Sequence, residues 1–215
     1  YMNFKKILLF IILAVTGISN LKSQNFEGKI SYKAEYSNIK IEGVTSSMLK
    51  QAMGSIEDFY IQSGNHLTQT NGTIMDWAVY RGNEDKIYFK MKDEKEIHYK
   101  NSKLFDKKLY KIEFYNETFN VLGYNCKKII IHFSDKTKIT SYYAPELSIE
   151  PNLFENDKYD GLYLLLSNTK AISLKTIYES AEYTKTIIAA KIRIEKLPEN
   201  TFELPSGLII IKAPW

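Results

Sequence analysis

The chain contains very little cysteine, proline or glycine. Its 215 residues include 1 Cys, 5 Pro and 10 Gly. A single cysteine excludes an internal disulfide, and so little proline and glycine is unlike a low-complexity or collagen-like chain. Aromatic residues are abundant instead, with 16 Tyr and 11 Phe, and such residues favour β-strands. A chain that is 44% hydrophobic and 25% charged is expected to fold around an ordinary core.

The motifs that mark common enzymes are also missing. The sequence has no glycine-rich phosphate loop, no nucleophile elbow and no dinucleotide fingerprint. Its three histidines, His66, His98 and His132, are scattered and show no metal-ligand spacing. We therefore expect no cofactor, no structural metal and no enzymatic activity. A hydrolase whose residues the sequence alone does not connect remains an alternative.

No hydrophobic run is long enough for a comfortable membrane anchor. The longest, Ile7–Ile18, has twelve residues, whereas a membrane-spanning helix needs about 20. It follows the basic start "MNFKK" and precedes small and polar residues, which is the layout of a secretory signal peptide. We predict that residues 1–23 are a signal, cleaved after Ser23 or alternatively after Ser19. The protein is then periplasmic, outer-membrane-associated or extracellular.

The apparent basicity of the chain lies largely in this signal. The whole sequence has 29 basic and 25 acidic residues, and the signal carries Lys5, Lys6 and Lys22 but no acid. The remaining domain is therefore nearly neutral. Nucleic-acid binding would need a clustered basic stripe, so no nucleic-acid partner is expected.

Hydrophobic patterning predicts a single β-rich domain over residues 24–215. Phe26–Tyr36 alternates strictly between apolar and polar residues, which is typical of a half-buried antiparallel strand. Residues 46–56 instead carry a helical stripe behind a capping residue, Thr45 or Ser46. Short strand-like runs then follow, separated by turn residues at 63–65, 71–73, 81–85, 92–96 and 134–137. This spacing predicts an antiparallel meander that is curled or closed into a barrel.

The last third of the chain breaks this rhythm. Residues 145–168 contain Pro145 and Pro151, which predict a loop excursion with one or two short turns. Two long strands follow, and the sequence closes with a Pro-Ser-Gly turn and a final strand. No linker or repeat divides the domain.

Several short motifs resemble a known family. They are "FEGKISY" near the start, "YIQSGNHL", "GYNCKK" at Gly123–Lys128, "YYAPEL" at Tyr142–Leu147 and "FELPSG" at Phe202–Gly207. The chain resembles a secreted bacterial family, largely of Bacteroidota, whose domain has no known function. The resemblance implies a lipoprotein-carrier-like (LolA/LolB-like) half-barrel: a curved antiparallel sheet with one short helix packed on its concave face. It covers most of residues 24–215 and implies no catalytic residues.

The related GLPGLI family shares the "GY-x-C" and "Y-x-P-E" elements. Its name-giving motif should fall near "DGLYLLLSN", where only Gly161 and Leu162 are kept and Tyr163 stands in place of proline. This departure favours the first family.

Cys126 and His132 are the most tempting candidates for catalysis. Their even spacing allows both side chains to lie on one face of a strand. Six residues at about 3.3 Å each nevertheless place them about 20 Å apart, too far for a nucleophile and its base. We interpret Cys126 as a buried, inert thiol.

Large apolar side chains are spread over successive strands. They form either the core between the sheet and the helix, or a concave apolar groove that holds a lipid or another hydrophobic small molecule. The candidate groove residues are Tyr32, Met48, Met53, Trp77, Phe89, Tyr99 and Tyr142. In the second interpretation the methionine-containing helix at 46–56 is an adaptable plug. A structural or protein-interaction module of the cell envelope, with a filled core, is the alternative function.

Overall fold

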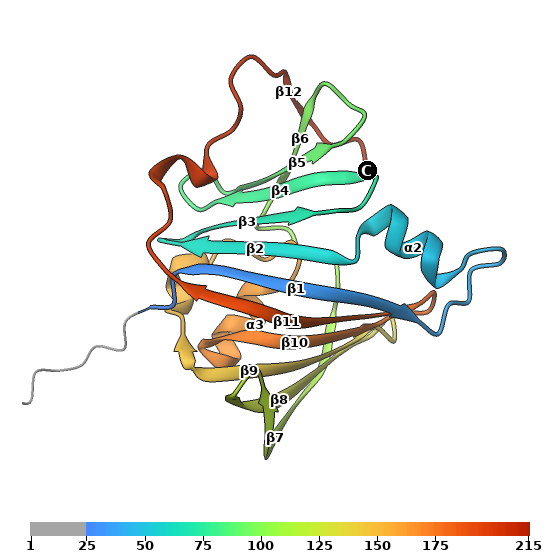
Figure 1. Ribbon diagram of the computed structural model, residues 1–215, viewed down its shortest axis with the longest axis vertical. Coiled ribbons are helices and arrows are strands. Elements are labelled where there is room, and N and C mark those ends of the chain that lie inside the picture. The colour runs from blue at the N-terminus through green and yellow to red at the C-terminus, as the bar shows by residue number, and fades with distance from the viewer. Residues whose placement is uncertain (1–24) are drawn as a thin grey trace, which may run out of the picture.

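A computed structural model describes residues 25–215, so the predicted signal peptide lies outside the described residues. The described chain forms one sheet of twelve strands in the order β12-β6-β5-β4-β3-β2-β1-β11-β10-β9-β8-β7 (Figure 1). Neighbouring strands are antiparallel, apart from the short β12, which pairs with β6 in parallel. The meander predicted from the short, evenly spaced strands is therefore confirmed.

The strands have the following bounds: β1 Gly28–Ser37, β2 Ile56–Gln62, β3 Asn65–Thr70, β4 Met75–Arg81, β5 Lys86–Met91, β6 Ile97–Asn101, β7 Leu109–Val121, β8 Tyr124–Phe133, β9 Lys138–Ser148, β10 Ala171–Glu179, β11 Thr184–Ile194 and β12 Ile210–Lys212. The helical elements are α2 Ser46–Met53, the 3-10 turn η1 Pro151–Phe154, α3 Leu162–Thr169 and the 3-10 turn η2 Glu199–Phe202. Within residues 25–215, no helix has the length and apolar character needed to cross a membrane.

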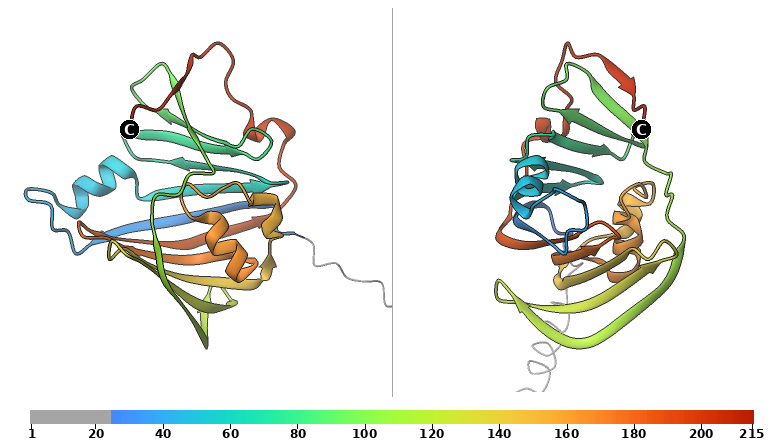
Figure 2. Two further views of the ribbon diagram at one scale, coloured as in Figure 1. Left: turned by 180° about the vertical axis from the view of Figure 1, so that it is seen from behind. Right: turned by 90° about the vertical axis from the view of Figure 1, so that its right-hand side faces the viewer.

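The sheet is open and strongly curved. In the right-hand view of Figure 2 the strands curl around a hollow, and α3 lies inside it. This is the mainly β half-barrel, with a short helix on its concave face, that the sequence predicts.

The alternation of β1 explains how the concave face is built. Ile30, Tyr32 and Ala34 are each at most 6% exposed. The charged residues Lys33 and Glu35, which alternate with them, are exposed. Because successive side chains of a strand point to opposite faces, the apolar set covers the hollow and the charged set covers the outside.

β1 also holds the two halves of the sheet together. It pairs with β2, its neighbour in sequence, on one edge and with β11, close to the other end of the chain, on the other. The core cluster around it contains Ile30 and Tyr32 from β1 together with Leu166 of α3 and Leu174 of β10.

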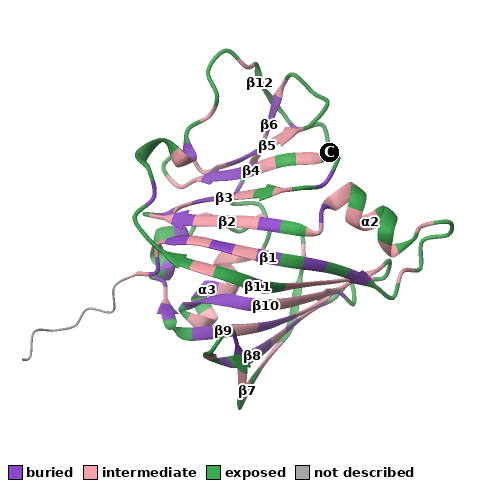
Figure 3. Ribbon diagram, in the orientation of Figure 1, coloured by how far each residue is buried: buried purple, intermediate pink, exposed green. Residues whose placement is uncertain are grey.

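The predicted helix at 46–56 exists as α2, but it is not the helix on the concave face. It begins where the Thr45 side chain accepts a hydrogen bond from the Met48 amide at 3.3 Å, as the capping signal predicts. None of its residues is buried, and it lies beside the last residues of β1 and next to the start of β2 (Figure 3). A helix in the short connection between two adjacent strands is held at their ends.

The hollow is filled instead by α3, from the segment predicted to be a loop excursion. This segment connects β9 to β10 and is long enough to fold back over the sheet. Leu166 is fully buried, and Leu162, Leu164 and Leu165 are partly buried. Four leucines bury more apolar surface than the sparse stripe of α2, so the hydrophobic effect favours α3 in this position.

A separate core cluster lies on the outer face of the β3–β6 region. Leu67 and Val79 alternate with residues of the concave face. They are covered by Leu197, which precedes η2, and by Phe202, the last residue of η2. The segment before β12 therefore seals the outside of this half of the sheet.

Candidate functional site

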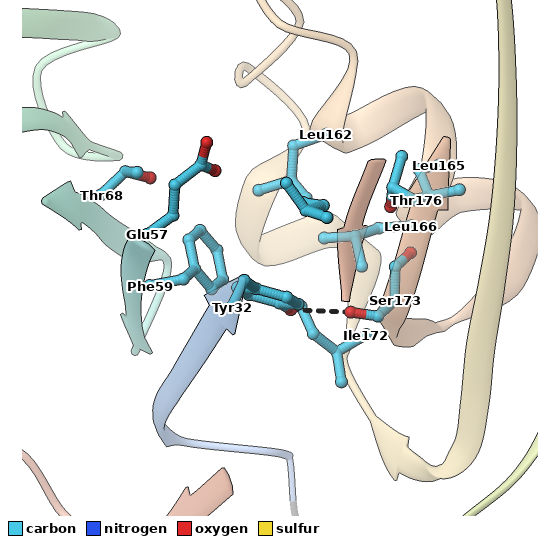
Figure 4. Close-up of a pocket in the computed structure, with 11 residues that line it drawn as sticks. Tyr32, Glu57, Phe59, Thr68, Leu162, Leu165, Leu166, Ile172, Ser173 and Thr176 are labelled. Atoms are coloured by element: carbon cyan, nitrogen blue, oxygen red, sulfur yellow. Dashed lines mark hydrogen bonds between the residues drawn. The ribbon is translucent and has the colours of Figure 1, made fainter. Parts of the chain in front are cut away.

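An apolar pocket of about 180 Å³ lies between the concave face and α3 (Figure 4). Strands β1, β2, β3, β10 and β11 form one wall and α3 forms the other. The lining residues are Tyr32, Glu57, Phe59, Thr68, Leu162, Leu165, Leu166, Ile172, Ser173, Thr176 and Ile187.

A second pocket, of about 160 Å³, adjoins the first along α3. It reaches β8 and β9 through Ile131 and Ile139, and it shares Leu162, Leu165 and Thr176 with the first pocket. Shared lining residues make the two pockets parts of one apolar depression that α3 partly fills. We call the two together the α3 groove.

Tyr32 is a fixed, neutral part of the groove wall. Its hydroxyl donates a hydrogen bond to the backbone carbonyl of Ser173 at 2.7 Å, and the Ser173 and Ser141 hydroxyls are 2.5 Å apart. Burial, reinforced by the charge of Glu57, raises the pKa of Tyr32 far above its usual range. The phenol is therefore an anchored wall group and not an acid or a base at neutral pH.

A buried ion pair fastens the segment that carries α3 to the sheet. His66 Nε2 of β3 lies 2.7 Å from Asp157 Oδ2, and their side chains are 3% and 0% exposed. The His66 ring stacks on Tyr80 with ring centroids 5.4 Å apart. Burial alone would lower the pKa of His66, but the charge of Asp157 and the hydrogen bond to it outweigh burial and raise that pKa. The charged pair is therefore favoured in the folded protein.

Asp160 stands beside this pair and lines the second pocket. It remains accessible to solvent, yet desolvation by crowded neighbours, together with the charge of Asp157, raises its pKa to about 6. One carboxylate, that of Asp160, thus lines the groove near the start of α3.

Of the seven candidate groove residues from the sequence, Tyr32 is the one that lines the α3 groove. Met48 and Met53 lie on α2, where Met48 is 50% exposed and the Met53 sulfur accepts a contact from the Tyr183 hydroxyl at 3.9 Å. The methionine helix is consequently not part of this pocket.

The other four candidates are divided between the two faces. Trp77 and Tyr99 pack against the outer cluster under η2. Phe89 meets the ring of Tyr159 at 5.8 Å, and Tyr142 packs against the concave core and the ring of Phe119 at 4.9 Å. The structure does not bring the seven together.

Leu162, Leu165, Leu166, Glu57, Thr176 and the pair His66–Asp157 belong to the site but were not singled out from the sequence. The apolar run "LYLLL" could have indicated a buried helix. The pairing of His66 with Asp157 joins residues 91 positions apart, and no spacing rule links them.

The structure does not bring Cys126 and His132 together. Cys126 is fully buried in the main core cluster and lies opposite Phe119 of β7, whereas His132 lies opposite Lys111. The β7–β8 register shifts beside Cys126, with the extra residues of a β-bulge on β7. His132 pairs with Glu113 at 2.8 Å on the outside.

The Cys126 thiol is expected to be inert in the folded protein. It is fully buried, and burial together with the charge of Glu146 raises its pKa to about 11. We expect negligible labelling by a thiol-reactive disulfide reagent at pH 8 in native buffer and complete labelling in guanidinium. Rapid labelling of the native protein would contradict this assignment.

In the part of the chain that the structure describes, no group of three or more His, Cys, Asp or Glu side chains is arranged to hold a metal ion.

Comparisons with known proteins identify the fold and no family. No family model matches the chain, and no curated protein matches it. Two crystal forms of PNGF-II resemble it with TM-scores of 0.50 and 0.51 and identities of 15% and 14%. The matches cover 87% of this chain but 31% and 32% of PNGF-II, so the chain spans about a third of that protein. LprF from Mycobacterium bovis matches with a TM-score of 0.32 and 9% identity, over 79% of this chain and 89% of LprF.

Such distant likenesses concern the fold alone. The described architecture is an open curved sheet around a helix, and its assignment as LolA-like remains a prediction from the sequence motifs. Membership of the secreted family that the sequence motifs resemble remains a prediction.

Proposed function

We propose that this chain is an exported, non-enzymatic envelope protein that binds a hydrophobic or lipid-like ligand in the α3 groove. The observation that carries the proposal is the groove itself, an apolar depression bounded by the concave sheet and by Leu162, Leu165 and Leu166. Burial of apolar ligand surface would provide the binding free energy, at about 25 cal/mol per Å².

The size of the groove favours a slender ligand. Each pocket alone is smaller than a usual small-molecule site, while the two together amount to about 340 Å³, near the lower end of the range for ligand pockets. A single alkyl chain lying along α3 would fit this shape better than a bulky polycyclic ligand. Export is supported by the basic start and apolar run at residues 2–18, and the absence of an enzymatic role by the inert Cys126.

Thr176 offers a direct test, because its side chain belongs to both pockets and stands on the sheet. Thr176→Phe should fill the junction of the groove and abolish binding. The protein would be purified gently from its own cell envelope and its bound small molecules measured by native mass spectrometry. The matched control is Thr186→Phe, which places the same ring on the outer face of β11, between the inward-facing Lys185 and Ile187.

We expect an apolar adduct on the wild type and on Thr186→Phe, and none on Thr176→Phe. An adduct that survives equally in both variants would place the ligand elsewhere. A wild-type protein without any adduct would remove the main support for a ligand carrier.

An interaction module of the envelope is the second candidate, and the outer edge of β7 favours it. This thirteen-residue strand pairs only with β8 in the described sheet, and it exposes Tyr110 and Phe114 at 77% and 58%. Long open edges with exposed aromatic side chains are surfaces on which another strand can pair.

A further inference from the structure

Glu57 is an unusual residue for the wall of an apolar groove. It is 8% exposed and lies in the first pocket beside Phe59, close to the hydrophobic residues of α3. Figure 4 shows its carboxylate projecting from β2 on the side where Thr68 and Leu162 also stand. A desolvated carboxylate is costly unless it is paired, so its retention in this position requires a partner.

The chain itself supplies an ionic partner for Glu57 but, within residues 25–215, no hydrogen bond to its buried Oε1. Lys185 Nζ of β11 contacts Glu57 Oε1, reaching across β1, and no hydrogen bond of acceptable geometry accompanies this ionic contact. The Lys185 side chain is 27% exposed and the Glu57 side chain 11% exposed. Glu57 Oε1 is buried and has no hydrogen-bond partner among the described residues, so the carboxylate keeps an open acceptor in the wall of the first pocket.

The surroundings of this oxygen favour a donor over an acceptor. Thr68 and Thr176 line the same pocket, and their hydroxyls can accept a hydrogen bond from a ligand as well as donate one. The adjoining pocket presents Asp160, whose neighbour Asp157 already pairs with His66. Glu57 and Asp160 line the groove, whereas Lys185 contacts Glu57 without lining either pocket, so a cationic head group in the groove would meet complementary charges.

We infer that the α3 groove selects an amphiphile with a primary ammonium head, which donates hydrogen bonds to Glu57, and with an alkyl tail along Leu162, Leu165 and Ile187. The inference rests on the proposed function, since it names the chemical class of ligand for the same groove. Glu57 is then a specificity-determining residue, and Lys185 is the intramolecular cation that the ligand head replaces or joins.

The test compares three probes of equal chain length below their micelle concentrations: dodecylamine, dodecanol and dodecanoate. Isothermal titration calorimetry at pH 7 measures the affinity of each for the full chain. We expect dodecylamine to bind roughly tenfold more tightly than dodecanol, as one desolvated charge-assisted hydrogen bond allows, and dodecanoate to bind most weakly.

Two substitutions assign the preference to Glu57. Glu57→Gln keeps the shape but removes the charge, so the amine should lose its tenfold advantage while dodecanol is unaffected. Lys185→Gln removes the competing cation and should strengthen amine binding, which provides a second measurement if Glu57→Gln fails to fold. Glu35→Gln, on the exposed outer side of β1, is the matched control and should change nothing.

The outcomes separate the two proposals. If all three probes bind with equal affinity, or if dodecanoate binds best, the ammonium inference is overturned while the apolar groove stands. An amine preference that Glu57→Gln leaves intact overturns the role of Glu57. If none of the probes binds, both the groove function and the inference drawn from it fail.

Discussion

Asp157→Ala is expected to lower the free energy of unfolding by about 3–5 kcal/mol, because it leaves His66 buried without its counter-charge. Both partners lie inside the protein, and Asp157 also holds the backbone turn that leads into α3, where its carbonyl accepts from the Tyr163 amide at 2.9 Å. Urea unfolding monitored by circular dichroism at pH 6 measures the effect.

The control is Glu179→Ala, which removes an ion pair at the surface. Lys138 and Glu179 are 2.7 Å apart, and their side chains are 35% and 37% exposed. Exposed pairs contribute about 1 kcal/mol or less, so this variant should unfold close to the wild type. Equal losses in the two variants would show that the buried pair does not fasten the α3 segment.

The same pair makes a signed prediction for pH. The pKa of His66 is raised in the folded protein, so the stability it contributes is complete below its unfolded pKa of 6.5 and is lost as pH rises through the folded pKa. Asp160, with its pKa of about 6, titrates below this window. Wild type should therefore lose stability above pH 6.5 relative to Asp157→Asn, in which the raised pKa is abolished.

Leu166→Ala is expected to cost about 2–5 kcal/mol, since it removes a fully buried side chain from the centre of the concave core. Leu166 is the one α3 residue that is completely buried, so its loss should also weaken the docking of α3 on the sheet. Urea unfolding gives the global effect, and amide hydrogen exchange of residues 162–169 reports local release of the helix.

Leu153→Ala is the matched control, because Leu153 lies in η1 of the same segment and is 41% exposed. Its substitution should change the free energy of unfolding much less. A cost below about 1 kcal/mol for Leu166→Ala would mean that α3 lies loosely in the hollow and contributes little to the core.

The strands could be predicted because each carries its signal locally. In β1 the buried Tyr32 and the exposed Lys33 alternate as the sequence indicates, and the turn at 134–137 separates β8 from β9. The parallel pairing of β12 with β6 could not be predicted, because it depends on the path that the segment around η2 takes between β11 and β12.

The choice between two helices was beyond local patterning. The stripe and cap of α2 predicted its existence correctly, and the prolines of residues 145–168 concealed α3. Which helix enters the hollow depends on the length of its connection and on the leucine surface that it buries. Both are properties of the whole folded chain and not of a local sequence pattern.

The site was predictable only at Tyr32. Tyr32 belongs to a clean alternating strand, so its inward direction follows from sequence alone. In the sequence, Glu57 follows a predicted helix and looks like an ordinary surface acid. His66 and Asp157 pair only after the segment that follows η1 folds over β3. Electrostatic sites of this kind arise from tertiary proximity, which one sequence does not record.

The pairing of β1 with β11 has a consequence for the order in which the molecule folds. The hairpins from β2 to β6 and from β7 to β10 join near neighbours in sequence and can form early. The central seam must bring together strands from opposite ends of the described chain, so its loop-closure entropy is the largest in the sheet. Until β11 pairs with β1, one edge of the first strand is unpaired and the groove lacks the part of its wall that Ile187 forms. We therefore expect the α3 groove to be the last part of this protein to form.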